Sequence, residues 1–415
     1  MLTLAAVVVS AQVSPAPPTL HTVATSAGFS EGSQGFAFPH IGGSDVVFAA
    51  YGVKGESLVQ QRAGKLVTVV TSAGSTKFSR VESPTSTNEA VAFVGTTHTE
   101  GLFMTSYPFS SYETIAEVSS SNGGFGSVQA PSLERSNVAF AGMRASLAGI
   151  YAAPASAAAA TRTVHTLINA SSPQPHRPHS KLRCLMDPSI SKAGYVAFFG
   201  SDCAGGAGRP LGKRMYRTML RQSHALHLDG SAGVVAGVYL AALPTEGAAW
   251  PAAGEAALTV VADSTTSVPG SSDVTFEGFS SPVASESTVA FVASTSDGAI
   301  GIYTYDLATP GSLQKIVDST TAVPGGAGTF SDFPYAPSIA GSTVVFYAAA
   351  GGATSGVYAH TQANGKGAVV RLVTMGDTID GEPVAFLGAG GASSDAKSAT
   401  FYAVTNTNGI YTVAI

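Results

Sequence analysis

The feature that most constrains the fold is a unit of about 45 to 55 residues that recurs along the whole chain. Each unit contains an apolar segment that reads Val-Ala-Phe or a close variant. A loop rich in Gly, Ser and Thr follows, and then a second segment that reads Gly-Ile-Tyr or a variant of it. The first segment occurs at 46–48, 91–93, 138–140, 196–198, 289–291, 344–346 and, more loosely, 399–401. The second occurs at 101–103, 149–151, 237–239, 301–303, 356–358 and 409–411, with 57–59 in its place in the first unit.

Two further strands complete each unit. A third apolar segment follows, for example at 66–70, 313–317 or 369–373. A fourth precedes each Val-Ala-Phe and is usually centred on a proline: Pro39, Pro84, Pro131, Pro188, Pro282 or Pro337. Aromatic and β-branched residues at these places favour packing between stacked sheets. The pattern therefore predicts an all-β fold, a seven-bladed β-propeller of four-stranded antiparallel blades, with a linear solenoid as the competing arrangement.

The ends of the chain indicate how the ring closes. The seventh unit ends at Ile415 without a fourth strand, whereas 20–28 matches 66–74 in seven of nine positions. We therefore expect the N-terminal strand to complete the last blade, which removes exposed sheet edges. This predicts a single propeller domain over 20–415, preceded at 1–19 by a signal-like apolar segment and a proline-rich linker.

The N-terminal segment favours export. Residues 1–12 form an apolar run that ends in small residues, like the second half of a secretory signal without its basic front. A buried β-strand is the alternative interpretation. Prolines at 15, 17 and 18 interrupt the run before the ~20 apolar residues that a membrane span needs. We expect a secreted or cell-surface protein with no membrane span in the mature chain.

The motifs resemble a known repeat family. Residues 317–325, Phe330, 337–339, 344–346 and 356–358 carry the pattern V-x-D-x-x-x-x-V-P-G…F…P-S-I-x-G…V-A-F…G-I-Y. This is similar to bacterial exported seven-bladed β-propeller repeat proteins and, more distantly, to TolB-type propellers. The resemblance implies the fold and an exported protein, and it implies no particular activity.

One region departs from the repeat. Insertions at 169–183 and 202–233 are basic, and 161–221 contains ten Lys or Arg against two Asp, a local balance of +8 in a chain of net charge −5. The first insertion joins two blades and the second joins the second and third strands of the fourth blade, so both are expected on the same rim of the propeller. The candidate ligand-binding residues are Arg177, Lys181, Arg183, Arg209, Lys213, Arg214, Arg217 and Arg221.

This cationic surface predicts a binding or scaffold module for an acidic polysaccharide or an extracellular protein, because arginine binds carboxylate and sulfate groups through paired hydrogen bonds. A solvated loop without a ligand is the alternative, and 209–229 fits the repeat so poorly that an error in the gene structure is another. The modest net charge does not suggest a nucleic-acid partner.

The only two cysteines, Cys184 and Cys203, lie at the roots of the insertions. Pairing the first two strands of the fourth blade places position 184 nearly opposite 201–203, so we expect a disulfide in an exported protein. Two separate thiols, or a metal site with neighbouring histidines, are the alternatives, although no recognised ligand spacing is present.

Catalytic signals are weak, and no cofactor is predicted. A lyase for uronate-containing polysaccharide is one alternative function, for which His176, His179, Arg183, Tyr216 and Arg217 supply suitable groups. A purely structural repeat protein is another. Asp263, Asp318 and Asp377 recur after the outer strands and are weak calcium candidates, although capping of a turn is the more usual role of such a residue.

Overall fold

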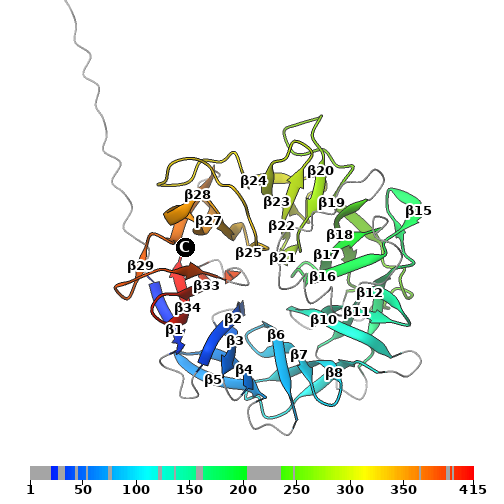
Figure 1. Ribbon diagram of the computed structural model, residues 1–415. Helices are drawn as coiled ribbons and strands as arrows, with labels where there is room; N and C mark the ends of the chain where they lie inside the picture. Colours follow the sequence, from blue (N-terminus) through cyan, green and yellow to red (C-terminus); the bar gives the residue numbers. More distant parts are fainter. Residues whose placement is uncertain are drawn as a thin grey trace, which may run out of the picture.

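The computed structural model describes residues 20–26, 33–42, 45–52, 55–72, 77–119, 124–134, 137–155, 162–202, 235–245, 248–363, 366–388, 393–394 and 397–415. In these ranges the chain forms seven antiparallel sheets of four or five strands arranged around a centre, as Figure 1 shows, and two separate two-stranded hairpins. The sequence prediction of a seven-bladed β-propeller is confirmed. None of the described residues forms a helix with the length and apolar content that a membrane crossing needs.

In each of the first four blades, the strands pair in chain order from the centre outward. Blade 1 comprises β2 (Ser33–Gly42), β3 (Asp45–Gly52), β4 (Gly55–Arg62) and β5 (Lys65–Thr71). Blade 2 comprises β6 (Arg80–Ser86), β7 (Ala90–Thr96), β8 (Glu100–Ser106) and β9 (Glu113–Glu117). Blade 3 comprises β10 (Phe125–Glu134), β11 (Asn137–Arg144), β12 (Leu147–Pro154) and β13 (His165–Asn169). Blade 4 comprises β16 (Cys184–Ile190), β17 (Tyr195–Ser201), β18 (Ala236–Ala242) and β19 (Leu258–Asp263).

Blades 5 and 7 differ in that their inner strand is divided into two short pieces. Blade 5 comprises β20 (Phe276–Phe279) and β21 (Val283–Ser285), then β22 (Thr288–Thr295), β23 (Ile300–Asp306) and β24 (Gln314–Asp318). Blade 6 comprises β25 (Ser338–Ala340), β26 (Thr343–Ala348), β27 (Gly356–Ala363) and β28 (Lys366–Thr374). Blade 7 comprises β31 (Phe386–Leu387) and β32 (Ser393–Ser394), then β33 (Ser398–Val404), β34 (Asn408–Ala414) and β1 (Leu20–Thr25).

The two ends of the chain share blade 7. Strand β1 pairs antiparallel with β34, and Leu20 lies opposite Val413. In Figure 1 the blue β1 accordingly lies beside the red β34. The expected closure by the N-terminal strand is confirmed.

The repeated aromatic residues meet across the two middle strands of a blade. Phe291 of β22 lies opposite Tyr303 of β23, and their rings stack with centroids 5.9 Å apart. Phe276 from the same blade packs edge-on against Tyr303 at 4.8 Å. Equivalent stacked pairs join Phe140 to Tyr151, Phe198 to Tyr239, Phe346 to Tyr358 and Phe401 to Tyr411. Blades 3 to 7 thus bury the same Phe–Tyr pair, which explains why Val-Ala-Phe and Gly-Ile-Tyr recur together. In blade 2 the pair is Phe93 on Phe103, and in blade 1 Val59 lies opposite Phe48.

The glycine before each Ile-Tyr or Val-Tyr allows the outer strand to approach closely. A Cβ atom on Gly237 would lie 2.6 Å from the carbonyl oxygen of Ala262 in β19. Contacts this short are repulsive, so a larger residue would displace the outer strand.

The prolines mark a bulge in the inner strands. Asp187, directly before Pro188, has a φ of 51°, and the pairing of β16 with β17 shifts between Met186 and Ser189. After the bulge, the Ser189 hydroxyl accepts a hydrogen bond of 2.9 Å from the backbone N–H of Ala284 in blade 5. The bulge thus turns a polar side chain toward the next blade and ties the two inner strands together.

Candidate functional site

The first basic insertion folds as a hairpin between blades 3 and 4. Strand β14 (Pro173–Gln174) pairs with β15 (Arg177–Lys181), and Figure 1 shows β15 at the outer edge of the ring. The backbone N–H of Arg183, just after the hairpin, donates to the carbonyl oxygen of Ser201 at 2.8 Å. Asp202 and Val235, on either side of the second insertion, are linked by a backbone hydrogen bond of 3.2 Å. The described ends of both insertions therefore lie at the same end of blade 4.

The predicted binding residues divide into two groups. Arg177, Lys181 and Arg183 are exposed, and in the described part of the chain none of them forms an ion pair with a carboxylate. We refer to the whole predicted set, Arg177, Lys181, Arg183, Arg209, Lys213, Arg214, Arg217 and Arg221, as the basic rim. Its last five members lie outside the described residues, as do Tyr216 and Cys203. The structure therefore locates only three members of the basic rim, Arg177, Lys181 and Arg183.

The histidines proposed for a lyase are also on the hairpin and exposed. Nδ1 of His176 lies 3.5 Å from Oδ2 of Asp263, at the end of β19. The Asp263 side chain is 3% exposed, whereas that of His176 is 61% exposed. His176 thus links the hairpin to the outer strand of blade 4, whereas His179 forms no ion pair with Asp263 in the described structure.

Asp263 caps the turn that follows its own strand. Its Oδ1 accepts hydrogen bonds from the Thr265 backbone N–H at 2.9 Å, from the Thr265 hydroxyl at 2.6 Å and from the Thr266 hydroxyl at 3.1 Å. This is the pattern in which an Asp side chain replaces a backbone acceptor in a tight turn.

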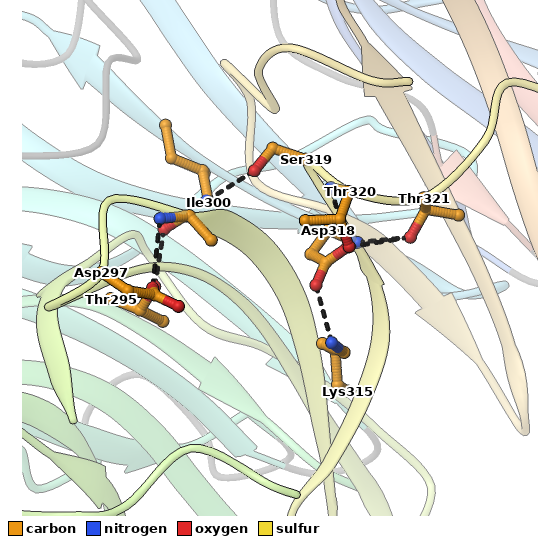
Figure 2. A network of polar contacts seen from close by, with 9 residues as sticks. Thr295, Asp297, Ile300, Lys315, Asp318, Ser319, Thr320 and Thr321 are labelled. Carbon is orange, nitrogen blue, oxygen red and sulfur yellow. Dashed lines mark hydrogen bonds and ion pairs between the residues drawn. The ribbon is translucent and has the colours of Figure 1, made fainter. Parts of the chain in front are cut away.

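The same arrangement recurs in blade 5, where Figure 2 shows it around Asp318. Oδ1 of Asp318 accepts from the backbone and hydroxyl of Thr320 and from the hydroxyl of Thr321, and Lys315 Nζ lies 2.7 Å from Oδ2. Burial alone would raise the pKa of Asp318, but the hydrogen bonds from Lys315 and the two threonines lower it to about 2.

Asp377 has a related role in blade 6. Its Oδ2 accepts from the backbone N–H of Thr374 at 2.7 Å, and its Oδ1 lies 3.3 Å from a guanidinium nitrogen of Arg371. The three aspartates belong to three different blades, and no group of three His, Cys, Asp or Glu suited to a metal occurs in the described ranges. The structure thus gives each of these residues a capping role and does not bring the three calcium candidates together.

Two buried polar residues at this end of blade 4 were not predicted. Tyr239, the recurring tyrosine of blade 4, is 1% exposed, and its hydroxyl has no hydrogen-bond partner among the described residues. Burial, followed by the nearby charges of Asp263 and Asp202, raises its pKa, and Arg177 opposes this shift. Gln174 of β14 is 2% exposed, and neither its amide nitrogen nor its amide oxygen has a partner in the described structure.

Cys184 begins β16 and lies opposite Ser201 in β17, as the sequence predicted. Its expected partner, Cys203, lies outside the described residues, so the disulfide stays a prediction.

No protein-family model matches the chain, and no curated protein matches it. Solved structures do resemble it. A puromycin-hydrolyzing peptidase of Mycobacterium tuberculosis is 13% identical with a TM-score of 0.50, and the match covers 89% of this chain and 48% of the peptidase. The present chain thus spans about half of that protein's length.

Two further solved structures match over most of both chains. The β-propeller domain of the Trilobed protease from Pyrococcus furiosus is 9% identical, with a TM-score of 0.49 and coverage of 92% of this chain and 94% of that one. An oligogalacturonate lyase from Vibrio parahaemolyticus is 9% identical, with a TM-score of 0.48 and coverage of 97% and 95%. At such low identity the likeness extends to the propeller fold alone.

Proposed function

We propose that this propeller is a secreted or cell-surface binding module that holds an acidic polysaccharide at its basic rim. The observation that carries the proposal is the first insertion, between blades 3 and 4, where Arg177, Lys181 and Arg183 are exposed and have no carboxylate partner among the described residues. Cations left unpaired on a chain of net charge −5 are available to an external anion.

The physical basis is the summation of weak contacts. A single exposed ion pair contributes only about 0 to 1 kcal/mol, because water and salt screen it. A repeating polyanion contacts many cations at once, and arginine adds paired hydrogen bonds to each carboxylate or sulfate. Binding of this kind should be strong at low ionic strength and should weaken steeply as salt is added.

The test is retention on a column of immobilised polygalacturonate. We expect the wild type to bind at low salt and to elute as salt rises. A variant with Arg177→Ser, Lys181→Ser and Arg183→Ser should elute much earlier with an unchanged melting temperature. The matched control replaces three exposed cations of blades 1 to 3, Lys65, Lys77 and Arg144, with serine and should behave as the wild type. Passage of the wild type through the column, or equal loss in the control, would reject the proposal.

A polysaccharide lyase remains the alternative, and the same substrate separates the two functions. Cleavage by β-elimination leaves a carbon–carbon double bond in the product, which absorbs ultraviolet light. His176, His179 and Arg183 are exposed on the hairpin, and the two other residues that the lyase hypothesis uses lie outside the described ranges. Appearance of unsaturated product with wild type, and its loss in His176→Ala, would replace the binding proposal with an enzymatic one.

A further inference from the structure

The aspartates that cap the turns after the outer strands of blades 5 and 6 each contact a cation of their own blade. Lys315 Nζ, in β24, lies 2.7 Å from Oδ2 of Asp318. A guanidinium nitrogen of Arg371, in β28, lies 3.3 Å from Oδ1 of Asp377. Lysine and arginine stay charged throughout the physiological range of pH. These two contacts are therefore ion pairs at any pH in that range.

The corresponding aspartate of blade 4 has a histidine as its partner, and this histidine comes from the inserted hairpin. Nδ1 of His176 lies 3.5 Å from Oδ2 of Asp263. The two atoms are farther apart than in a normal N–H···O hydrogen bond, so their attraction depends on a positive charge on the imidazole. Histidine is the side chain whose charge changes between about pH 5 and pH 8. The contact is therefore an ion pair when His176 is protonated and is lost as the pH rises.

Little else holds this hairpin to the propeller through polar groups. Strands β14 and β15 form a sheet of their own, and neither pairs with a blade in the described ranges. Leu182, just after β15, is fully buried and fixes the base. Gln174 is also buried, but its amide forms no hydrogen bond in the described structure. For 173–181, the His176–Asp263 contact is the only ion pair or side-chain hydrogen bond to a blade among the described residues.

The charged groups around this contact come from the hairpin and from two strands of blade 4. Asp263 ends β19, Asp202 follows β17, and Arg177 is next to His176 on the hairpin. All three act on the buried Tyr239 hydroxyl of β18. Its pKa is raised first by burial and then by Asp263 and Asp202, and Arg177 opposes the shift. Two carboxylates against one guanidinium leave this end of blade 4 negative until His176 takes a proton.

Protonation also changes the surface that a polyanion meets. His176 and His179 are exposed on the same hairpin as Arg177 and Lys181. Each imidazolium adds one cation to the basic rim. An anchored hairpin also holds its cations in place, which lowers the cost of ordering them on binding. Linkage requires the reverse effect as well: a bound polyanion favours protonation of the two histidines.

We propose that the β14–β15 hairpin makes the basic rim pH-dependent: protonation of His176 and His179 anchors the hairpin on Asp263 and adds positive charge, so the rim holds an acidic polysaccharide more tightly in mildly acidic solution. The proposal rests on the proposed glycan-binding function and adds the regulation of the same site. Release as the pH rises is its consequence.

The first test measures the affinity for polygalacturonate by calorimetry at about pH 5.5 and about pH 8, at one low salt concentration. The uronate carboxylates are ionised at both values. Wild type should bind about threefold to tenfold more tightly at the lower pH. Near pH 6.5 binding should take up protons, which two buffers of different ionisation enthalpy detect. The double variant His176→Gln, His179→Gln should lose both effects. The matched control His21→Gln, His98→Gln, which changes two exposed histidines of blades 7 and 2, should behave as wild type.

A second test separates the anchor from the added charge. Asp263→Asn keeps an oxygen to cap the turn and removes the charge that His176 contacts. Protection of the β15 amides from hydrogen exchange, corrected for the intrinsic effect of pH, should be higher at the lower pH in wild type and equal at both in Asp263→Asn. Asp318→Asn is the control in blade 5 and should leave the behaviour of β15 as in wild type.

The outcomes distinguish this proposal from the proposed function. Equal affinity of wild type at the two pH values, or the same pH dependence in the double histidine variant, would reject the pH-dependent rim and leave the binding function standing. Equal protection of β15 at both pH values in wild type would reject the anchor. If wild type binds polygalacturonate at neither pH, the proposed function itself fails.

Discussion

Nδ1 of His176 lies 3.5 Å from Oδ2 of Asp263, in the position that Lys315 Nζ takes beside Asp318 in the next blade. Lys315 is three residues before its aspartate, and the corresponding residue of blade 4 is Val260. The side chain that contacts the aspartate comes from the outer strand itself in blade 5 and from the inserted hairpin in blade 4. The basic hairpin is therefore attached to the propeller at Asp263, an aspartate that caps a turn in blade 4 as Asp318 does in blade 5.

His176→Ala should loosen the hairpin without unfolding the propeller. The contact is largely exposed and should contribute no more than about 1 kcal/mol to global stability. Hydrogen exchange of the amides in β15 should nevertheless become faster, since the side-chain link to blade 4 is lost. Lys315→Ala is the matched control, because it removes the equivalent cation from blade 5. Equal exchange in both variants would show that His176 does not hold the hairpin.

Asp318 should make the protein more stable above pH 4 than at pH 2. Its folded pKa of about 2 is lower than its model-peptide value of 3.8, so the ionised form is favoured in the folded state. The resulting stabilisation is complete above the unfolded pKa and is lost as the pH falls through the folded one. Asp318→Asn should cost about 2 kcal/mol at neutral pH and flatten the dependence of unfolding free energy between about pH 4 and pH 2. Denaturant titrations at several pH values measure this; an unchanged slope would contradict it.

Removal of the N-terminal strand should be far more destabilising than removal of the segment before it. Deleting 20–24 leaves the outer edge of β34 unpaired and exposes the edge of blade 7, at an expected cost of about 3 to 5 kcal/mol. The melting temperature should fall by about 4 to 6 °C. Deleting 1–12 should have little effect. Equal melting temperatures for the two truncations would contradict the role given to β1.

Cys184 and Cys203 should form a disulfide in the exported protein. Cys184 lies opposite Ser201, and two further residues bring the chain to position 203. Intact-mass measurement after alkylation of the unfolded, unreduced protein should find no added label, and prior reduction should allow two. Labelling of both thiols without reduction would show that the pairing is wrong.

Gly237→Ala should destabilise blade 4 by about 1 to 3 kcal/mol. The new Cβ would lie 2.6 Å from the carbonyl oxygen of Ala262 and 2.8 Å from the Cβ of Asp263, so β19 would have to move. Gly35→Ala is the control, because a Cβ there meets no atom within 4 Å. Chemical denaturation of both variants measures the difference. Similar stabilities would mean that β19 shifts without cost.

The blades could be predicted because six of the seven bury an aromatic pair across their two middle strands. Phe291 and Tyr303 stack across neighbouring strands. The same two residue types recur at the corresponding positions of other units, because the same packing is needed there. The likeness of 20–28 to 66–74 similarly predicted closure. Tyr239 could not be distinguished in this way, because a tyrosine occupies the corresponding core position in each of blades 3 to 7. Blade 4 differs from the others in the loop between its second and third strands, β17 and β18, which is the long basic insertion. Gln174 is in no repeat, so no periodic signal identified it.

The sequence pattern also did not predict that the inner strands of blades 5 and 7 are each divided into two short strands. Strands β20 and β21 both pair with β22, and the break between them falls before Pro282. In blade 4 a proline at the corresponding place leaves a single bulged strand. Both inner strands donate to a serine of the preceding blade, from the Ile190 N–H to Ser132 in blade 4 and from the Ala284 N–H to Ser189 in blade 5, so this hydrogen bond does not explain the difference.

The pairing of β1 with β34 sets an order of events during biosynthesis. Strand β1 leaves the ribosome long before its partner β34 and must wait for it, because that partner lies in 408–414. Any prematurely terminated chain therefore presents two open strand edges, one on β1 and one on its last completed blade. Such edges pair readily with other chains. Completion of synthesis is thus a condition for solubility as well as for folding, and interrupted products should be the ones that aggregate or are degraded.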